Sequence, residues 1–165
     1  MTTLTDTRSF ATPDHTQVPW PKVIGLTLVL GVIAVLASPN APLGGFWRPD
    51  PLSPTPTAAQ LPLFILLNMA EGLTFGGGIS FLLFGFPMLR AISPASERLT
   101  RIVHLAIAWS LLNWWPHDSL HIHVGMNLGG LLAIEYGFHV TLMICGAIMA
   151  WFFLVLLRGR TNLEL

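Results

Sequence analysis

Four long apolar stretches, separated by short polar or proline-rich segments, constrain the fold of this chain more than any other feature of its sequence. The stretches cover about residues 22–38, 61–89, 99–116 and 131–157. A helix needs about 20 predominantly apolar residues to cross the hydrocarbon core of a bilayer, and each stretch approaches or exceeds this length. We therefore predict an all-α integral membrane protein in which four transmembrane helices form a bundle.

The composition of the chain agrees with a lipid environment. Of its 165 residues, 53% are hydrophobic and only 10% are charged, whereas about a quarter of the residues in soluble domains are charged. The formal net charge is zero and the sequence has no basic run, so it lacks the electrostatic footprint of a nucleic-acid-binding protein. We expect the lipid bilayer as the main partner, together with other membrane subunits or further copies of this chain.

One membrane domain is expected between two polar tails. Residues 1–21 are rich in threonine and proline and are predicted to form a disordered cytoplasmic tail. The membrane domain covers residues 22–160, and residues 161–165 form a second short tail. The first apolar stretch also has a feature of a cleaved signal sequence, because the residues VLA precede Ser38. The long and weakly basic segment before it favours a retained helix instead.

The arginines and lysines are distributed asymmetrically among the predicted connections. Seven of the eight lie in tails or at helix ends on one side of the predicted bundle: Arg8, Lys22, Arg90, Arg98, Arg101, Arg158 and Arg160. The other side has only Arg48. Because positively charged segments are retained in the cytoplasm, we predict that both termini are cytoplasmic, which for a bacterial protein means the inner membrane. A histidine-rich segment then lies on the extracytoplasmic side.

This segment, NWWPHDSLHIHVG at residues 113–125, contains ionisable groups in an otherwise apolar region. It is predicted to be re-entrant or to lie at the membrane interface. If it is helical, His117 and His121 lie on one face with Asp118 nearby. If it is extended, His121 and His123 point to the same side. Either arrangement can bind a transition metal, with Asp118 as a ligand or as an acceptor for a ring N–H.

Three more ionisable residues lie in the same half of the predicted bundle. Glu71 is about 15 Å along its helix from Leu61, near the bilayer midplane. A carboxylate at that depth is expected to face the bundle interior, where it balances charge, relays protons or joins helices by a hydrogen bond. Glu135 and His139, four residues apart, begin the fourth stretch. They are candidates for a second carboxylate or proton relay and a further metal ligand, or for a simple carboxylate–imidazole pair.

The convergence of these residues favours a metal site, with His121 and His123 as the first candidate ligands and His117, Asp118 and His139 next. Imidazole and carboxylate groups suit copper, zinc or iron. Heme b is a weaker alternative, because the two most deeply placed histidines, His104 and His139, lie toward opposite faces of the membrane. A structural polar cap and a pH-sensing or proton-relaying cluster are the other interpretations of the histidine-rich segment.

The sequence contains no catalytic motif that would assign an enzymatic activity. We expect a small membrane metalloprotein or a metal-binding subunit of a membrane redox complex. A non-catalytic accessory or assembly subunit is the alternative, and a proton-coupled carrier that uses Glu71 is a third hypothesis. Gly72 and Gly76, four residues apart in the second stretch, predict the close approach of a neighbouring helix in any of these cases.

Overall fold

The computed structural model describes residues 18–93 and 95–161, and all regular elements within these ranges are helices. In chain order they are α1 (Trp20–Leu36), the 3₁₀ helix η1 (Gly44–Trp47), α2 (Leu61–Ile92), α3 (Glu97–Leu112), α4 (Trp114–Val124), α5 (Leu128–Ile134), the π-helical segment η2 (Glu135–Val140) and α6 (Thr141–Thr161). The all-helical class predicted from the sequence is confirmed. Most of the predicted N-terminal tail lies outside the described residues.

Within the described residues, two helices are long and apolar enough to cross a membrane. The first is α2, and the second is the continuous helix Leu128–Arg158, which includes α5, η2 and most of α6. Helix α1 is apolar but has only 17 residues, and α3 has 16 residues. These lengths and compositions give weak support to a membrane location, and the four-span arrangement stays a prediction.

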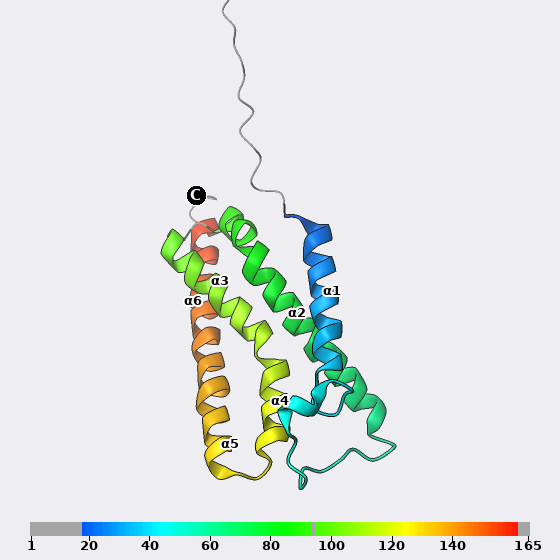
Figure 1. Cartoon of the computed structure of the whole chain (residues 1–165). Helices are drawn as coiled ribbons and strands as arrows, with labels where there is room; N and C mark the ends of the chain where they lie inside the picture. Colours follow the sequence, from blue (N-terminus) through cyan, green and yellow to red (C-terminus); the bar gives the residue numbers. More distant parts are fainter. Residues whose placement is uncertain (1–17, 94, 162–165) are drawn as a thin grey trace, which may run out of the picture.

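The two ends of the molecule differ in the side chains that they carry. Figure 1 shows that α1 begins, α2 ends, α3 begins and α6 ends at the same end of the molecule. We call it the basic end, because these helix ends carry Lys22, Arg90, Arg98, Arg101 and Arg158. The start of α2, η1, α4 and α5 lie at the opposite end (Figure 1), which we call the histidine end.

Helices α1 and α2 pack through glycines at very short range. A Cβ atom at Gly76 would lie 2.3 Å from the carbonyl oxygen of Thr27, and one at Gly72 would lie 2.8 Å from the carbonyl oxygen of Gly31. Both positions therefore need glycine, and the close approach predicted from their spacing is confirmed. The Thr27 hydroxyl adds a hydrogen bond of 2.9 Å to Ser80 of α2.

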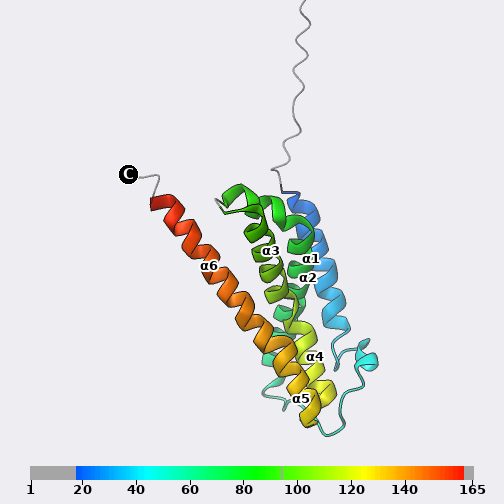
Figure 2. The same cartoon turned by 90° about the vertical axis from the view of Figure 1, so that its left-hand side faces the viewer.

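An apolar core joins α2, α3 and α6 near the basic end. Its buried residues are Leu89, Ala95, Val103 and Phe152, and the partly buried Leu99, Ile107, Ile148, Val155 and Leu156 pack around them. Figure 2 shows that α6 is inclined to α1, α2 and α3. The long last helix therefore crosses the bundle at an angle, and much of its apolar surface is exposed.

The chain bends between α3 and α4 at Asn113, and the histidine-rich segment that follows is helical. The side-chain amide of Asn113 donates to the carbonyl oxygen of Trp109 at 2.6 Å, and Asn113 itself is fully buried. Pro116 lies in the first turn of α4, where the missing N–H of proline breaks no intrahelical hydrogen bond. The extended arrangement of the histidines is therefore excluded, and the helical one is found.

Candidate metal centre

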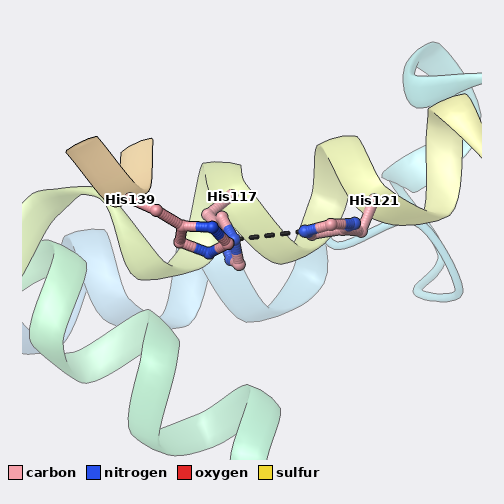
Figure 3. Close-up of side chains that lie close together, drawn as sticks. All are labelled: His117, His121 and His139. Carbon is pink, nitrogen blue, oxygen red and sulfur yellow. Dashed lines mark hydrogen bonds between the residues drawn. The ribbon is translucent and has the colours of Figure 1, made fainter. Parts of the chain in front are cut away.

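Three imidazoles converge at the histidine end from two helices. His117 and His121 are one turn apart on α4, and His139 extends from η2. The Nε2 atom of His117 lies 2.9 Å from Nε2 of His139 and 3.2 Å from Nε2 of His121. One nitrogen from each ring lies within 4.8 Å of the other two. Figure 3 shows the rings of His117 and His139 next to each other, with His121 directed toward them from α4.

A carboxylate fixes the outer nitrogen of two of these rings. Nδ1 of His117 lies 2.6 Å from Oδ1 of Asp118, and Nδ1 of His139 lies 2.7 Å from Oε2 of Glu135. Because a carboxylate accepts hydrogen bonds, each Nδ1 carries a proton, and in the neutral form of the ring Nε2 then exposes its lone pair. Histidines that bind metals are commonly held in this way, with one nitrogen on a carboxylate and the other on the ion.

This tautomer creates an electrostatic problem at the centre of the cluster. The lone pairs of His117 and His139 face each other at 2.9 Å, and the third Nε2, that of His121, is close by. Two facing lone pairs repel unless a cation lies between them. A single proton can bridge one nitrogen pair, whereas a metal ion about 2.0–2.1 Å from each nitrogen can satisfy all three. The arrangement therefore suits three-histidine coordination with a further position open to another ligand.

The π-helical segment η2 helps to place His139. A π-helical turn contains an extra residue relative to an α-helix, which shifts the faces of the helix that follow, and such turns are frequent at functional sites. Within η2, Glu135 and His139 remain paired while the ring of His139 reaches His117 on α4. The sequence spacing predicted the pair but not the π-helical turn, for which EYGFHV gives no recognisable signal.

The three rings differ in their exposure to solvent or lipid. The side chain of His117 is 9% exposed and that of His139 is 39% exposed. His121 is intermediate, and burial together with the nearby His117 lowers its pKa below the usual value. A lowered pKa keeps this imidazole neutral at neutral pH, and the neutral form is the one that binds metals.

The other histidines predicted from the sequence lie elsewhere. His123 is exposed, and its Nδ1 lies 3.1 Å from the carbonyl oxygen of Arg48, outside the three-histidine cluster. His104 is buried on α3, where its Nε2 lies 2.9 Å from the carbonyl oxygen of Phe81. Of the histidines named as candidate ligands, the geometry thus brings His117, His121 and His139 together and leaves His123 outside. It gives no support to a heme held between His104 and His139.

Glu71 is near the three imidazoles but lies beyond Asp118, which contacts one of them. Glu71 shares a cavity wall with Asp118, whose carboxylate contacts Nδ1 of His117. Both acidic residues line a cavity that His121 also borders. The predicted convergence of Glu71 with the histidine-rich segment is therefore observed, with Asp118 as the residue that connects them.

The proline-rich connection between α1 and α2 lies against the end of α4. The backbone N–H of Asp50 and the hydroxyl of Ser53 both donate to the carbonyl oxygen of Ile122, at 3.0 and 3.1 Å. Gly125 follows with a positive φ of 52°, and a Cβ atom there would lie 2.0 Å from a carboxylate oxygen of Asp50. The connection therefore holds the helix that carries two of the three imidazoles.

Sequence reasoning did not identify the contacts by which Ser38, just after α1, connects to this end of the molecule. Ser38 receives a hydrogen bond of 2.9 Å from the indole N–H of Trp115 and donates one of 2.6 Å to Oδ1 of Asn68. Its serine side chain is buried. A single serine after an apolar helix carries no sequence signal for such contacts, because they depend on how three helices meet.

Comparisons of the chain with protein-family models, with curated proteins and with solved structures give no match. The function is therefore argued from the geometry of the histidine end alone.

Proposed function

We propose that this chain is a small membrane protein that binds a transition metal ion through His117, His121 and His139. Asp118 and Glu135 orient two of the rings by accepting their Nδ1 protons. The observation that carries the proposal is the pair of Nε2 atoms 2.9 Å apart, with a third Nε2 beside them. Zinc, copper and iron all accept imidazole ligands, and any of them would fill this centre.

The proposed membrane arrangement has four spans, with both termini in the cytoplasm and the metal centre on the extracytoplasmic side. Its support is the position of the cations, since all of the described arginines and lysines except Arg48 lie at the basic end. Positively charged segments remain on the cytoplasmic side, which puts the histidine end outside. The lipid bilayer is the partner of the exposed apolar surface, and association with other membrane subunits is a further part of the proposal.

The direct test is metal analysis of protein purified in detergent and loaded with zinc. We expect about one zinc ion per wild-type chain, and a large loss of bound zinc in His117→Ala, His121→Ala and His139→Ala. The matched control is His123→Ala, because His123 lies on the same helix but contacts Arg48 instead of the cluster. This control is expected to keep full zinc stoichiometry.

Two results would contradict the proposal. One is wild-type protein that binds no zinc, copper or iron above the level of a variant in which His117, His121 and His139 are all replaced by alanine. The other is a loss of metal from His123→Ala as large as that from His139→Ala. Metal-free protein that purifies with a stable partner would favour the accessory-subunit hypothesis instead.

A further inference from the structure

A cavity of about 400 Å³ lies beside His121, between the connection that follows α1, the first half of α2, and α4. This volume falls within the range of small-molecule sites. His121 borders the cavity on the side of the proposed metal centre, and Glu71 and Asp118 also line it. The metal centre and the cavity therefore share a wall, and a molecule in the cavity would lie beside the metal.

One part of the cavity wall is polar. Here Glu71 and Asp118 contribute carboxyl groups to the wall, and Asn68, three residues before Glu71 on α2, contributes a side-chain amide. Oδ1 of Asn68 already accepts a hydrogen bond from Ser38. The group that Asn68 can offer to a ligand is therefore its side-chain N–H₂, which is a donor. Carboxyl acceptors and an amide donor together match a hydroxyl group, which both donates and accepts.

The remaining wall of the cavity is mainly apolar. It is built by Leu61, Phe64, Ile65 and Leu67 of α2 with Ile122 of α4. The four residues of α2 are exposed on the surface of a helix that is long and apolar enough to cross a membrane. The mouth of the cavity therefore opens among apolar side chains, which favours a ligand that arrives from lipid over a hydrated ion.

We propose that this cavity binds a small apolar molecule with a hydroxyl head group, of the class of alkylphenols and quinols. Its hydroxyl group contacts Glu71, Asp118 and Asn68, and its apolar body lies against Phe64 and the neighbouring aliphatic side chains. This proposal extends the proposed metal function, because it assigns a class of ligand to the cavity that adjoins the proposed metal centre. Binding in the cavity needs no metal ion, so the two proposals can be tested separately.

The test compares 4-propylphenol with propylbenzene, which has nearly the same size but no hydroxyl group. Binding is measured by ligand-observed NMR with the full chain in lipid nanodiscs, and empty nanodiscs give the contribution of partition into lipid. We expect saturable binding of 4-propylphenol, roughly tenfold tighter than that of propylbenzene, which corresponds to about one hydrogen bond to a polar group.

Two pairs of variants locate the binding site. Glu71→Leu removes a head-group contact, so 4-propylphenol is expected to lose its advantage over propylbenzene. Leu67→Trp narrows the mouth and is expected to weaken the binding of both compounds. Its control is Leu63→Trp, since Leu63 is exposed on the same helix but does not line the cavity. Glu97→Leu is the control for Glu71→Leu, because it is the same substitution at an exposed glutamate of α3 that does not line the cavity.

The outcomes separate this proposal from that of the metal centre. Equal affinity for the two compounds, or signals no larger than those of empty nanodiscs, would overturn the cavity proposal even if zinc binds. Saturable binding of 4-propylphenol that Leu67→Trp weakens and Leu63→Trp preserves would support it. If zinc fails to bind while this pattern holds, the metal proposal fails and the cavity proposal stands.

Discussion

The two ends of this molecule are held together by different chemistry. At the basic end, α2, α3 and α6 meet through apolar side chains around Val103 and Phe152. At the histidine end, α4 and the start of the last helix meet through His117 and His139, each backed by a carboxylate. Apolar contacts need no ion, whereas facing imidazole lone pairs need a cation. If the three histidines bind a metal ion as proposed, the ion stabilises the histidine end and leaves the basic end unaffected.

The largest expected effect is a local stabilisation by zinc. At free zinc about 1,000 times its Kd, opening of the site is expected to cost about 4 kcal/mol more than without zinc. Hydrogen exchange should therefore slow at the amides of α4 and η2, and remain unchanged around Leu89 and Val103. His117→Ala is the control and should show no zinc effect. Equal slowing at both ends in the wild-type protein would contradict the comparison.

Destabilising the apolar core of the basic end is expected to leave metal binding unchanged. Phe152 is 3% exposed in the apolar core, and its replacement by alanine is expected to lower the free energy of unfolding by about 3 kcal/mol. The adjacent Phe153 is 63% exposed, so Phe153→Ala should have a much smaller effect. Thermal unfolding in detergent measures both values. Loss of zinc from folded Phe152→Ala protein would show that the two ends are coupled.

The carboxylates of the histidine end can be tested without removal of a ligand. Asp118→Asn is expected to weaken zinc binding about tenfold to hundredfold, because the amide no longer fixes the tautomer of His117 as a carboxylate does. Glu135→Gln should have a smaller effect, since Glu135 is 56% exposed and Asp118 is 39% exposed. Zinc titration with a competing chelator gives both affinities. An Asp118→Asn affinity equal to that of the wild type would remove Asp118 from the proposed centre.

The sequence could predict part of the histidine end but not its final ligand set. The spacing of His117 and His121 indicates one face of a helix, and the spacing of Glu135 and His139 indicates a pair. On a helix, residues two apart do not face each other, so His121 and His123 diverge once α4 forms. The choice between helix and extended segment was open in the sequence, and the meeting of His139 with His117 depends on tertiary structure.

The basic end shows a different limit of sequence reasoning. The apolar stretches were predicted to be helices, and helices α1, α2, α3 and α6 are found there. In lipid, however, a residue that faces the bilayer is as apolar as one that faces another helix. Phe152 and Phe153 are therefore indistinguishable by type, although one is buried and the other is exposed. Glycine spacing was the informative signal, because only close helix contact requires it.

The smallest expected effect concerns the contact between α1 and α2. Replacement by alanine is expected to change the stability in opposite directions at two adjacent glycines. A Cβ atom at Gly76 would lie 2.3 Å from the carbonyl oxygen of Thr27, whereas the nearest atom to a Cβ atom at Gly77 is a methyl carbon of Thr27 at 3.9 Å. Alanine favours a helix over glycine by about 1 kcal/mol.

Gly77→Ala is therefore expected to be neutral or slightly stabilising, because its new methyl group has space. Gly76→Ala is expected to destabilise the protein by about 1–2 kcal/mol, because the backbone of α1 must move away to relieve the overlap. Thermal unfolding of the two variants in the same detergent measures the difference. Equal effects would mean that α1 does not lie this close to α2. A change in zinc affinity from Gly76→Ala alone would mean that the position of α1, through Ser38 and its contact with Trp115, also determines the position of α4.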